Sequence, residues 1–415
     1  VTLPAEGLPK GTLKVMTGKG EAMSSQRLST GELVFTARDV PACGSKDYRI
    51  ETTPGDSMIH NMQCDGTTLQ SRHLALTVDP ESGVVRSLKR TLGRFQSECV
   101  ATSNKPGLGA YVYVEGRDPA NRKSSGPAKV TMKENGPVMV SLLVESPAPG
   151  CRSLTREIRL IQDAPYAELI VTMDREKVYN QEAVHLAFPF DVPDPVIRID
   201  TPWAPVEVEK DQFKGACKNY LTVQRWVDIS NNDFGVTLAP VDAPLIEIGA
   251  LTNDPRVVGW RETIKPSSLI YSYAMNNYWE TNYKAEQEGI TTFRYAILPH
   301  EGAFDEVQAS RFGVEASQPL MAVPVPPETP SAESFLRVQP EQVLVTNLKP
   351  SDDGNAWIAR LYGASNETQQ ARILGGNKVF EKLYLSDLNE SLEKPVQKSI
   401  EVPPHGMTTV RFTHK

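Results

Sequence analysis

Residues 129–175 read KVTMKENGPVMVSLLVESPAPGCRSLTREIRLIQDAPYAELIVTMDR, and this stretch indicates the fold class. Apolar side chains recur at every second position along its runs, the period that places successive side chains on opposite faces of a β-strand. Asn135-Gly136 and the segment 162–165 interrupt the alternation with turn residues. Asn-Gly favours the positive φ angles of a tight type I′ turn. The stretch therefore predicts consecutive antiparallel hairpins, each with one buried and one wetter face.

The same pattern continues outward from this stretch in both directions. Leu74, Leu76 and Val78 share one face of a predicted strand, and a turn-like segment follows at 79–83. The 32 prolines and 28 glycines divide the chain into short runs of this kind. The sequence therefore predicts an all-β protein built from antiparallel β-sandwiches.

Helical periodicity is scarce, and the best candidate lies at residues 386–398. Leu388, Leu392 and Val396 follow one another at four-residue spacing, which is typical of one face of a helix. Pro395 within the same segment opposes a helix, because proline lacks the N–H that a helix interior needs. The sequence leaves both structures open there.

Two changes in composition divide the chain into three predicted domains. Polar and turn residues at 51–56 end a first small sandwich at 1–57, and five prolines between 319 and 330 indicate a linker. The middle segment, 58–320, is large for one sandwich and predicts a many-stranded supersandwich or two packed sheets. The segment 331–415 is predicted to form a C-terminal small sandwich.

The overall composition of the 415-residue chain excludes several classes of protein. Its formal net charge of −7 argues against nucleic-acid binding through a broad basic face. Its apolar runs are far shorter than the roughly 20 residues of a membrane-spanning helix. The five cysteines form no CxxC pair and are expected to be buried thiols. The chain opens directly in strand-like residues, Val1-Thr2-Leu3, without a signal peptide, which suggests a piece of a longer protein.

Standard catalytic motifs are absent, but two dense polar and aromatic segments depart from simple strand patterning. They lie at 210–228 and 275–284. Amides offer a donor and an acceptor to sugar hydroxyls, and aromatic rings pack on sugar C–H surfaces. The second segment therefore predicts carbohydrate contact through Asn276, Asn277, Tyr278, Trp279 and Asn282. The alternative is that its amides cap turns and its rings fill the core. Arg225 and Asp228 in the first segment are predicted to form a structural ion pair.

These segments also carry a resemblance to a known family. The runs EAVHLAFPF (182–190), KDQFKGACKNYLTVQRWVDISNNDFGVTL (210–238) and MNNYWETNYKAEQEGITTFRYAILPH (275–300) resemble the C-terminal half of bacterial glycoside hydrolase family 38 α-mannosidases. LTVDPESGVVRSLKR (76–90) is similar to the opening hairpin of that family's galactose-mutarotase-like supersandwich. Residues 11–50 and 343–373 resemble the small β-domains on either side. The resemblance covers nearly the whole chain, in order.

The resemblance implies an accessory role, because the family's catalytic barrel has no counterpart here. Family members hold zinc and two catalytic carboxylates in a (β/α) barrel, followed by a helical bundle, and this chain shows no alternating βα pattern. We therefore expect no catalytic residue, metal site or cofactor in this chain, with zinc in the absent domain. The expected partners are that barrel, the helical bundle and mannose-containing glycans, with neither nucleic acid nor membrane. The parent protein would be a retaining α-mannosidase, soluble in the bacterial cytoplasm or periplasm, and this chain alone would be inactive.

Two alternatives remain open from the sequence. One is a stand-alone carbohydrate-binding module. The other is a mutarotase-like or lyase-like enzyme on the supersandwich, for which His73, His185, Tyr278 and Glu280 are the available groups. Likeness of fold alone is a weak basis for assigning an activity.

Overall fold

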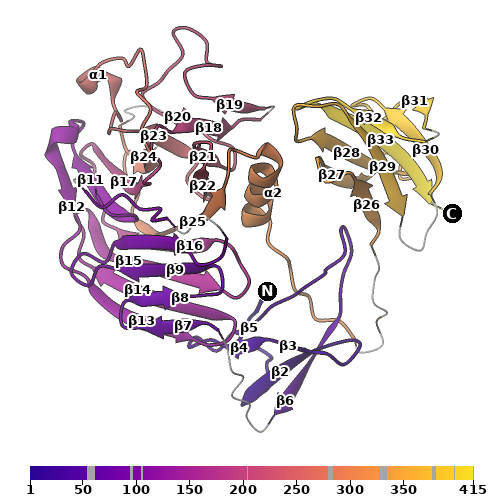
Figure 1. Ribbon diagram of the computed structural model, residues 1–415, viewed down its shortest axis with the longest axis horizontal. Helices are drawn as coiled ribbons and strands as arrows, with labels where there is room; N and C mark the ends of the chain where they lie inside the picture. The colour runs from indigo at the N-terminus through magenta and orange to yellow at the C-terminus, as the bar shows by residue number, and fades with distance from the viewer. Residues whose placement is uncertain are drawn as a thin grey trace.

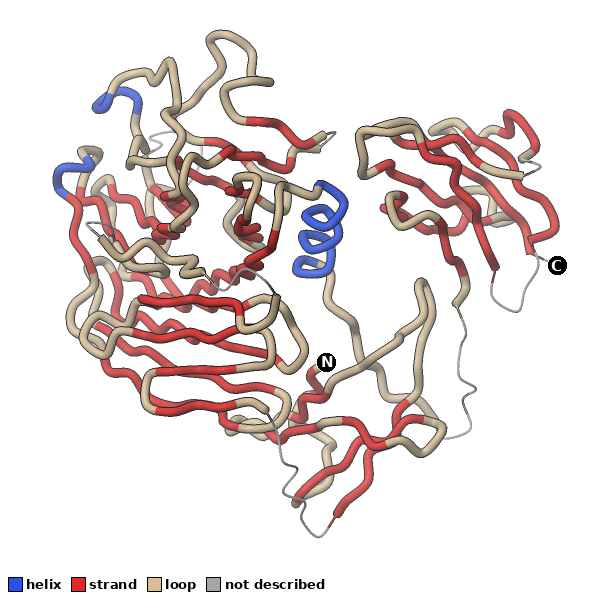
Figure 2. Tube along the Cα trace, viewed as in Figure 1, coloured by secondary structure: helices blue, strands red, loops and turns tan. Residues whose placement is uncertain are grey.

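Strands dominate the chain from end to end. The computed structural model describes residues 1–414 except 54–60, 94–96, 104–105, 203, 279–283, 327–328, 330–333, 376–379 and 397. Figure 1 shows the strands stacked in layers, and Figure 2 shows how little of the described chain is helical. The sheets are built from antiparallel pairs, such as β15 (Cys151–Ile161) with β16 (Ala167–Arg175). The predicted all-β class with antiparallel sheets is therefore confirmed.

The N-terminal part is a small sandwich of two three-stranded sheets. One has the order β1 (Thr2–Leu3), β5 (Leu33–Phe35), β4 (Ser25–Arg27), and the other β3 (Ala22–Met23), β2 (Thr12–Thr17), β6 (Tyr48–Thr53). Leu13 and Val15 of β2 alternate with more exposed residues and pack against Leu33 and Phe35 of β5. These strands fall within the predicted segment 1–57.

Three sheets form the large middle part, which we call the supersandwich. The four-stranded sheet has the order β10 (Val85–Arg90), β9 (Leu74–Val78), β8 (Thr68–Gln70), β7 (Gln63–Asp65). The six-stranded sheet has the order β12 (Arg122–Ser124), β11 (Ala110–Glu115), β17 (Glu182–Pro189), β24 (Leu269–Asn276), β23 (Leu245–Ile248), β20 (Leu221–Thr222). The nine-stranded sheet has the order β13 (Lys129–Asn135), β14 (Met139–Ser146), β15, β16, β25 (Gly289–Glu301), β22 (Phe234–Pro240), β21 (Val227–Ser230), β18 (Val196–Asp200), β19 (Pro205–Glu207).

One continuous hydrophobic core lies among these three sheets. Every second residue of β16 is buried, because one face of this strand points into the core. By contrast, β17 is buried at every position. One face of β17 lines the same core, while Ala183 and Ala187 on the other face belong to a separate apolar cluster. The second face of the six-stranded sheet is therefore covered as well, and the candidate site lies there.

The predicted hairpins at 129–175 are present, but Gly136 in the first turn has a structural role that the sequence did not indicate. Asn135 pairs with Val140, and Gly136 does not adopt the positive φ angle of a type I′ turn. A Cβ atom at Gly136 would lie 2.3 Å from the side chain of Gln26. The Gln26 amide oxygen accepts the N–H groups of Val138 and Met139. The glycine therefore allows the N-terminal sandwich to dock on this turn.

The longest helix of the described chain, α2 (Glu306–Ser317), was not predicted from the sequence. Asp305 caps its first turn by accepting two backbone N–H groups, and Phe312 packs on the outer face of the nine-stranded sheet. The two other helical turns are η1 (Pro119–Asn121) and α1 (Pro255–Val258). No helix in the described ranges is long and apolar enough to cross a membrane.

Two sheets form the C-terminal sandwich. One has the order β26 (Leu336–Gln339), β29 (Gln369–Gly375), β32 (Ile400–Val402), and the other β27 (Val343–Pro350), β28 (Trp357–Gly363), β33 (Met407–His414), β30 (Phe380–Ser386), β31 (Leu392–Pro395). The helix considered for 386–398 is wrong. β30 and β31 pair there across a turn in which Glu390 has a positive φ angle, and Pro395 fits at the end of an edge strand.

Candidate functional site

Aromatic and polar side chains gather on the second face of the six-stranded sheet. The register of β17 and β24 places His185 opposite Tyr273, and the register of β23 and β24 places Glu247 opposite Tyr271. Opposite residues of neighbouring strands point to the same face, so these four side chains meet. His185 stacks on Tyr273 with ring centroids 4.4 Å apart and meets Tyr271 edge-on.

The most deeply buried polar side chains on this face are a histidine and a glutamate that contact each other. His185 Nε2 lies 3.0 Å from Glu247 Oε2, and both side chains are fully buried. Glu247 Oε1 accepts the backbone N–H of Thr252 at 2.8 Å. The side chain of Asn253 is buried next to them and donates to the Tyr278 hydroxyl at 2.6 Å. We call His185, Glu247, Asn253, Tyr273 and Tyr278 the polar centre.

Residues 249–265, which we call the strap, cross this face and close it from solvent. Asn219 clamps the strap: its amide nitrogen donates to the carbonyls of Thr252 and Gly259, and its amide oxygen accepts the N–H of Arg261 at 3.1 Å. Asn219 is itself buried, so its loss would leave strap groups without partners. The dense segment 210–228 thus contributes to the site by shaping the strap.

The second dense segment reaches the same strap through Tyr278. Arg117 donates to the Tyr278 carbonyl at 2.6 Å, lies over its ring at 5.0 Å, and pairs with Asp254 at 2.5 Å. Asp254 also caps α1 by accepting the N–H of Arg256. The structure therefore brings the two dense segments together on one strap, although they lie about 50 residues apart in the chain.

Each predicted sugar-contact residue in the described chain has a defined place. Asn277 is buried; its nitrogen donates to the carbonyls of Val178 and Asn180, and its oxygen accepts the N–H of Glu182 at 2.6 Å. Asn276 is partly exposed and accepts the N–H of Tyr278. Trp279, Asn282 and Glu280 lie outside the described residues.

Burial sets the protonation of the tyrosines in the polar centre. Burial raises the pKa of Tyr273 and of Tyr278 well above the ordinary value for a tyrosine, and neighbouring Glu247 adds to both increases. Both phenols are therefore neutral at physiological pH. Tyr273 donates to the Asn253 carbonyl, while Tyr278 accepts from the Asn253 amide.

Three important members of this site were missed from the sequence: Arg117, Glu247 and Asn253. The sequence did contain a local signal for the start of α1 in the strap, because Asp254-Pro255 is a typical N-cap and first-turn pair of a helix. Nothing local marks Glu247, which meets His185 of β17, or Arg117, whose partners Asp254 and Tyr278 lie far away in the sequence. Of the residues named for a mutarotase-like site, His185 and Tyr278 belong to the polar centre, whereas His73 lies by β9 in the four-stranded sheet.

The predicted Arg225–Asp228 ion pair is wrong. Asp228 instead accepts the hydroxyls of Ser230 and Thr237 and lies 2.9 Å from His300 Nε2. Arg225 is close to Asp200, where burial raises the pKa of the carboxyl to about 6 and Arg225 opposes that rise. Arg225 precedes β21, so the alternation of side chains along that strand does not place Arg225 on the same face as Asp228.

No zinc site can be built from the described residues. Among them, no three His, Cys, Asp or Glu side chains gather closely enough to hold a metal ion. All five cysteines are free. The polar centre contains only two side chains of the types that bind zinc, His185 and Glu247, whereas a zinc site needs at least three protein ligands.

Comparison with known proteins identifies the family. The model of the "Glycosyl hydrolases family 38 C-terminal domain" matches residues 69–242, and that of the "Glycosyl hydrolases family 38 C-terminal beta sandwich domain" matches 342–412. No curated protein sequence matches the chain. Together the two family models cover more than half of the chain.

Solved structures agree in fold. A glycosyl hydrolase family 38 protein from Enterococcus faecalis is similar over 99% of this chain and 55% of its own, with 12% identity and a TM-score of 0.73. An α-mannosidase from Enterococcus faecalis V583 is similar over 99% of this chain and 53% of its own, with 13% identity and a TM-score of 0.72. The chain thus spans about half the length of these two proteins. By the two family models, the chain belongs to glycosyl hydrolase family 38, as a C-terminal region of that family.

Proposed function

We propose that this chain is the accessory C-terminal β-region of an α-mannosidase-type glycoside hydrolase. In this role it supports the catalytic barrel and borders the barrel's carbohydrate site. The two family models and the likeness to one half of an α-mannosidase support the proposal. Its partners would be the barrel, the helical bundle and mannose-containing glycans.

One observation carries the proposal: a rigid loop system presents apolar side chains to solvent. Val257, Val258 and Trp260 on the strap are 46%, 39% and 55% exposed, and Phe213 in the first dense segment is 89% exposed. The strap beneath them is held by the buried hydrogen bonds of Asn219 and Asn253. Apolar residues exposed on a fixed scaffold are typical of a surface that another domain covers. This is the surface we assign to contact with the barrel.

The segment that begins at Asn276 fits the border of a sugar site in this arrangement. Asn277 anchors the start of this segment to the sheet, and Tyr278 bonds to Asn253 of the strap. Asn276, Trp279 and Asn282 remain our proposed contacts with sugar or with barrel loops, whereas Tyr278, which the sequence also suggested, is buried in the polar centre.

The test uses the full-length enzyme and changes Trp260 to Ala. Because Trp260 is exposed in this chain but would be covered by the barrel, its loss should lower kcat/KM for aryl α-mannosides by about tenfold or more. Tyr179→Ala is the matched control, because Tyr179 is 65% exposed outside the strap. Unchanged kcat/KM in a folded Trp260→Ala enzyme would contradict the proposed contact.

A further inference from the structure

A cleft of about 1100 Å³ lies between the supersandwich and the C-terminal sandwich. One wall consists of β18, β19 and the loop before α2, and the other consists of C-terminal loops around Gln342, Asn366 and His405. Figure 1 shows that β19 and α2 lie on the side of the supersandwich that is nearest to the C-terminal sandwich. Ligand sites occur preferentially between domains, and a site of roughly 300–1000 Å³ holds a drug-sized ligand. The cleft is therefore large enough for several sugar rings.

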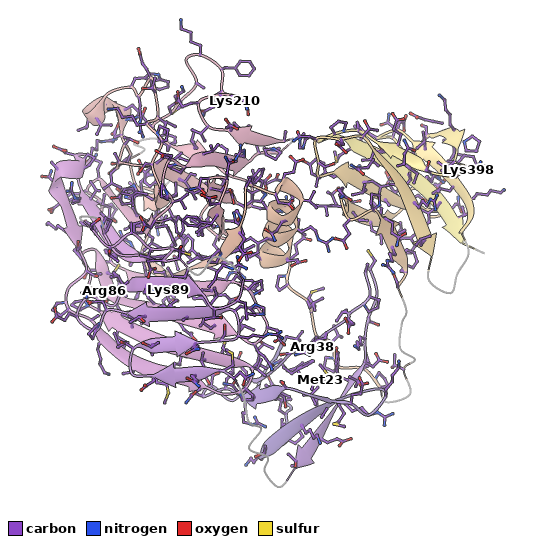
Figure 3. The ribbon with its side chains drawn as sticks, in the orientation of Figure 1. Met23, Arg38, Arg86, Lys89, Lys210 and Lys398 are labelled. Carbon is purple, nitrogen blue, oxygen red and sulfur yellow. The ribbon has the colours of Figure 1, made fainter. Side chains whose placement is uncertain are left out.

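The supersandwich wall holds a guanidinium group in a fixed orientation. Arg198 donates to Glu207 at 2.9 Å and lies over the ring of Phe304 at 5.0 Å. Lys210 reaches the same carboxylate at 3.4 Å and is otherwise exposed, as Figure 3 shows beside β19. Donors and acceptors thus stand next to each other on this wall, the pairing that adjacent hydroxyls of one sugar can satisfy.

The opposite wall carries a second ordered group. The Glu306 carboxylate accepts the backbone N–H of Asn366 at 2.5 Å, and His405 Nε2 lies 2.9 Å from the Asn366 side-chain oxygen. His405 also lies 3.6 Å from Glu306. This contact joins the two walls and fixes the polar edge of the cleft, so ligand groups would meet a preorganised surface.

The charges of the lining restrict the ligand class. Six carboxylates line the cleft against two permanent cations: Glu207, Asp211, Asp305, Glu306, Glu341 and Glu367 against Arg198 and Lys210. This excess of negative charge disfavours phosphorylated or sulfated ligands. The Phe304 ring is covered by Arg198 and packs against Trp226, so hydrogen bonds rather than ring stacking would supply most of the affinity.

We propose that this cleft binds a neutral oligosaccharide. The site lies on the face of the supersandwich next to the C-terminal sandwich, apart from the strap, and would hold a glycan chain without acting on it. The proposal stands independently of the accessory role, because no barrel residue takes part. With an open cleft and few stacking contacts, the dissociation constant should be about 0.1–1 mM.

The test titrates the 415-residue chain with linear mannose oligosaccharides and follows binding by NMR. Saturable binding is expected, and Arg198→Ala should weaken it by about tenfold. Because Arg198 also supports Phe304, Asn232→Ala in the same lining provides a milder second variant, expected to weaken binding about threefold. Lys398→Ala is the control, since Lys398 is exposed on the C-terminal sandwich outside this lining (Figure 3).

Three outcomes would overturn the proposal: no saturable binding, binding that both cleft variants leave unchanged, or equally tight binding of a phosphorylated mannose oligosaccharide that is titrated in parallel. Failure here would leave the proposed accessory function intact, because that function is tested by catalysis in the full-length enzyme. Conversely, an inactive strap variant would say nothing against glycan binding in the cleft.

Discussion

Two neighbouring asparagines of the candidate site make different contacts, and the contrast gives a prediction at the residue scale. Asn277 is 4% exposed, and its side chain bonds to backbone groups of segment 178–182 and to the Ala285 carbonyl, whereas Asn276 is partly exposed and caps a single turn. Losing buried hydrogen bonds leaves backbone groups without partners. Asn277→Ala should therefore lower the free energy of unfolding by about 2–4 kcal/mol.

Chemical denaturation of this chain checks that expectation. Asn276→Ala is the matched control, expected to cost less than about 1 kcal/mol because its one turn contact is partly solvated. Equal stabilities for the two variants would show that the bonds of Asn277 do not support the fold. If Asn277→Ala is destabilised, a loss of activity in the full-length Asn277→Ala enzyme would reflect a loss of structure and not a lost sugar contact. Asn276→Ala would be the better probe of sugar contact.

At the scale of elements, α2 contains a glycine where helix propensity favours almost any other residue. A Cβ atom at Gly313 would lie 2.8 Å from Trp226 Cδ1 and 2.9 Å from Arg225 Cβ, and Trp226 is fully buried. Alanine gains about 1 kcal/mol in helix propensity, but overpacking a buried site costs about 1–3 kcal/mol. Gly313→Ala should therefore destabilise the chain by up to about 2 kcal/mol in thermal unfolding.

Gln308→Ala provides the comparison on the same helix. Gln308 is exposed, so this substitution should stay within about 0.5 kcal/mol of the wild type. If Gly313→Ala proved more stable than the wild type, Trp226 would have room to move, and the close approach of α2 to β21 would not be fixed by the glycine.

Which elements the sequence could predict depends on whether their signals are local. The alternation in β16 is local, and the strand forms as predicted. In 386–398 the four-residue spacing of Leu388, Leu392 and Val396 fits a strand period of two equally well, so this spacing could not decide between a helix and a strand. α2 was missed because its apolar face is narrow: only Ala309, Phe312 and Gly313 are buried.

The contacts within the candidate site were even harder to predict from local sequence. Amides and rings in 275–284 indicated a specialised loop, but composition cannot tell whether an amide faces backbone or ligand. Asn277 faces backbone. Glu247 enters the site because β23 pairs with β24, and Arg117 enters it because it follows β11, which is separated from β24 only by β17. No short stretch of sequence encodes this strand order. Their roles therefore required the fold.

At the scale of the whole molecule, few contacts set the position of the C-terminal sandwich. The Cys43 carbonyl accepts the N–H of Phe335 at 3.0 Å, which ties this sandwich to the N-terminal part. Glu306 at the start of α2 ties it to the supersandwich through Asn366 and His405. The linker residues at 319–326 are exposed; Met321, for example, is 90% exposed. The orientation thus depends on small polar joints rather than on a broad apolar interface.

Removing the Glu306 joint should therefore loosen the molecule without unfolding either part. Glu306→Ala deletes the acceptor for the Asn366 N–H and the partner of His405, and no buried apolar contact is lost with it. We expect a larger radius of gyration in small-angle X-ray scattering and faster protease cleavage within 319–326, while the thermal unfolding temperature changes little. Gln308→Ala is the control on the same helix, because Gln308 is exposed, whereas Arg311 pairs with Glu341 of the C-terminal sandwich and is itself a joint between the two parts. A scattering profile of Glu306→Ala identical to that of Gln308→Ala would mean that the other joints set the orientation, namely the Arg311–Glu341 pair and the contacts of Ala42 and Cys43 with Ser334 and Phe335. In that case the walls of the glycan cleft would be positioned without the Glu306 joint.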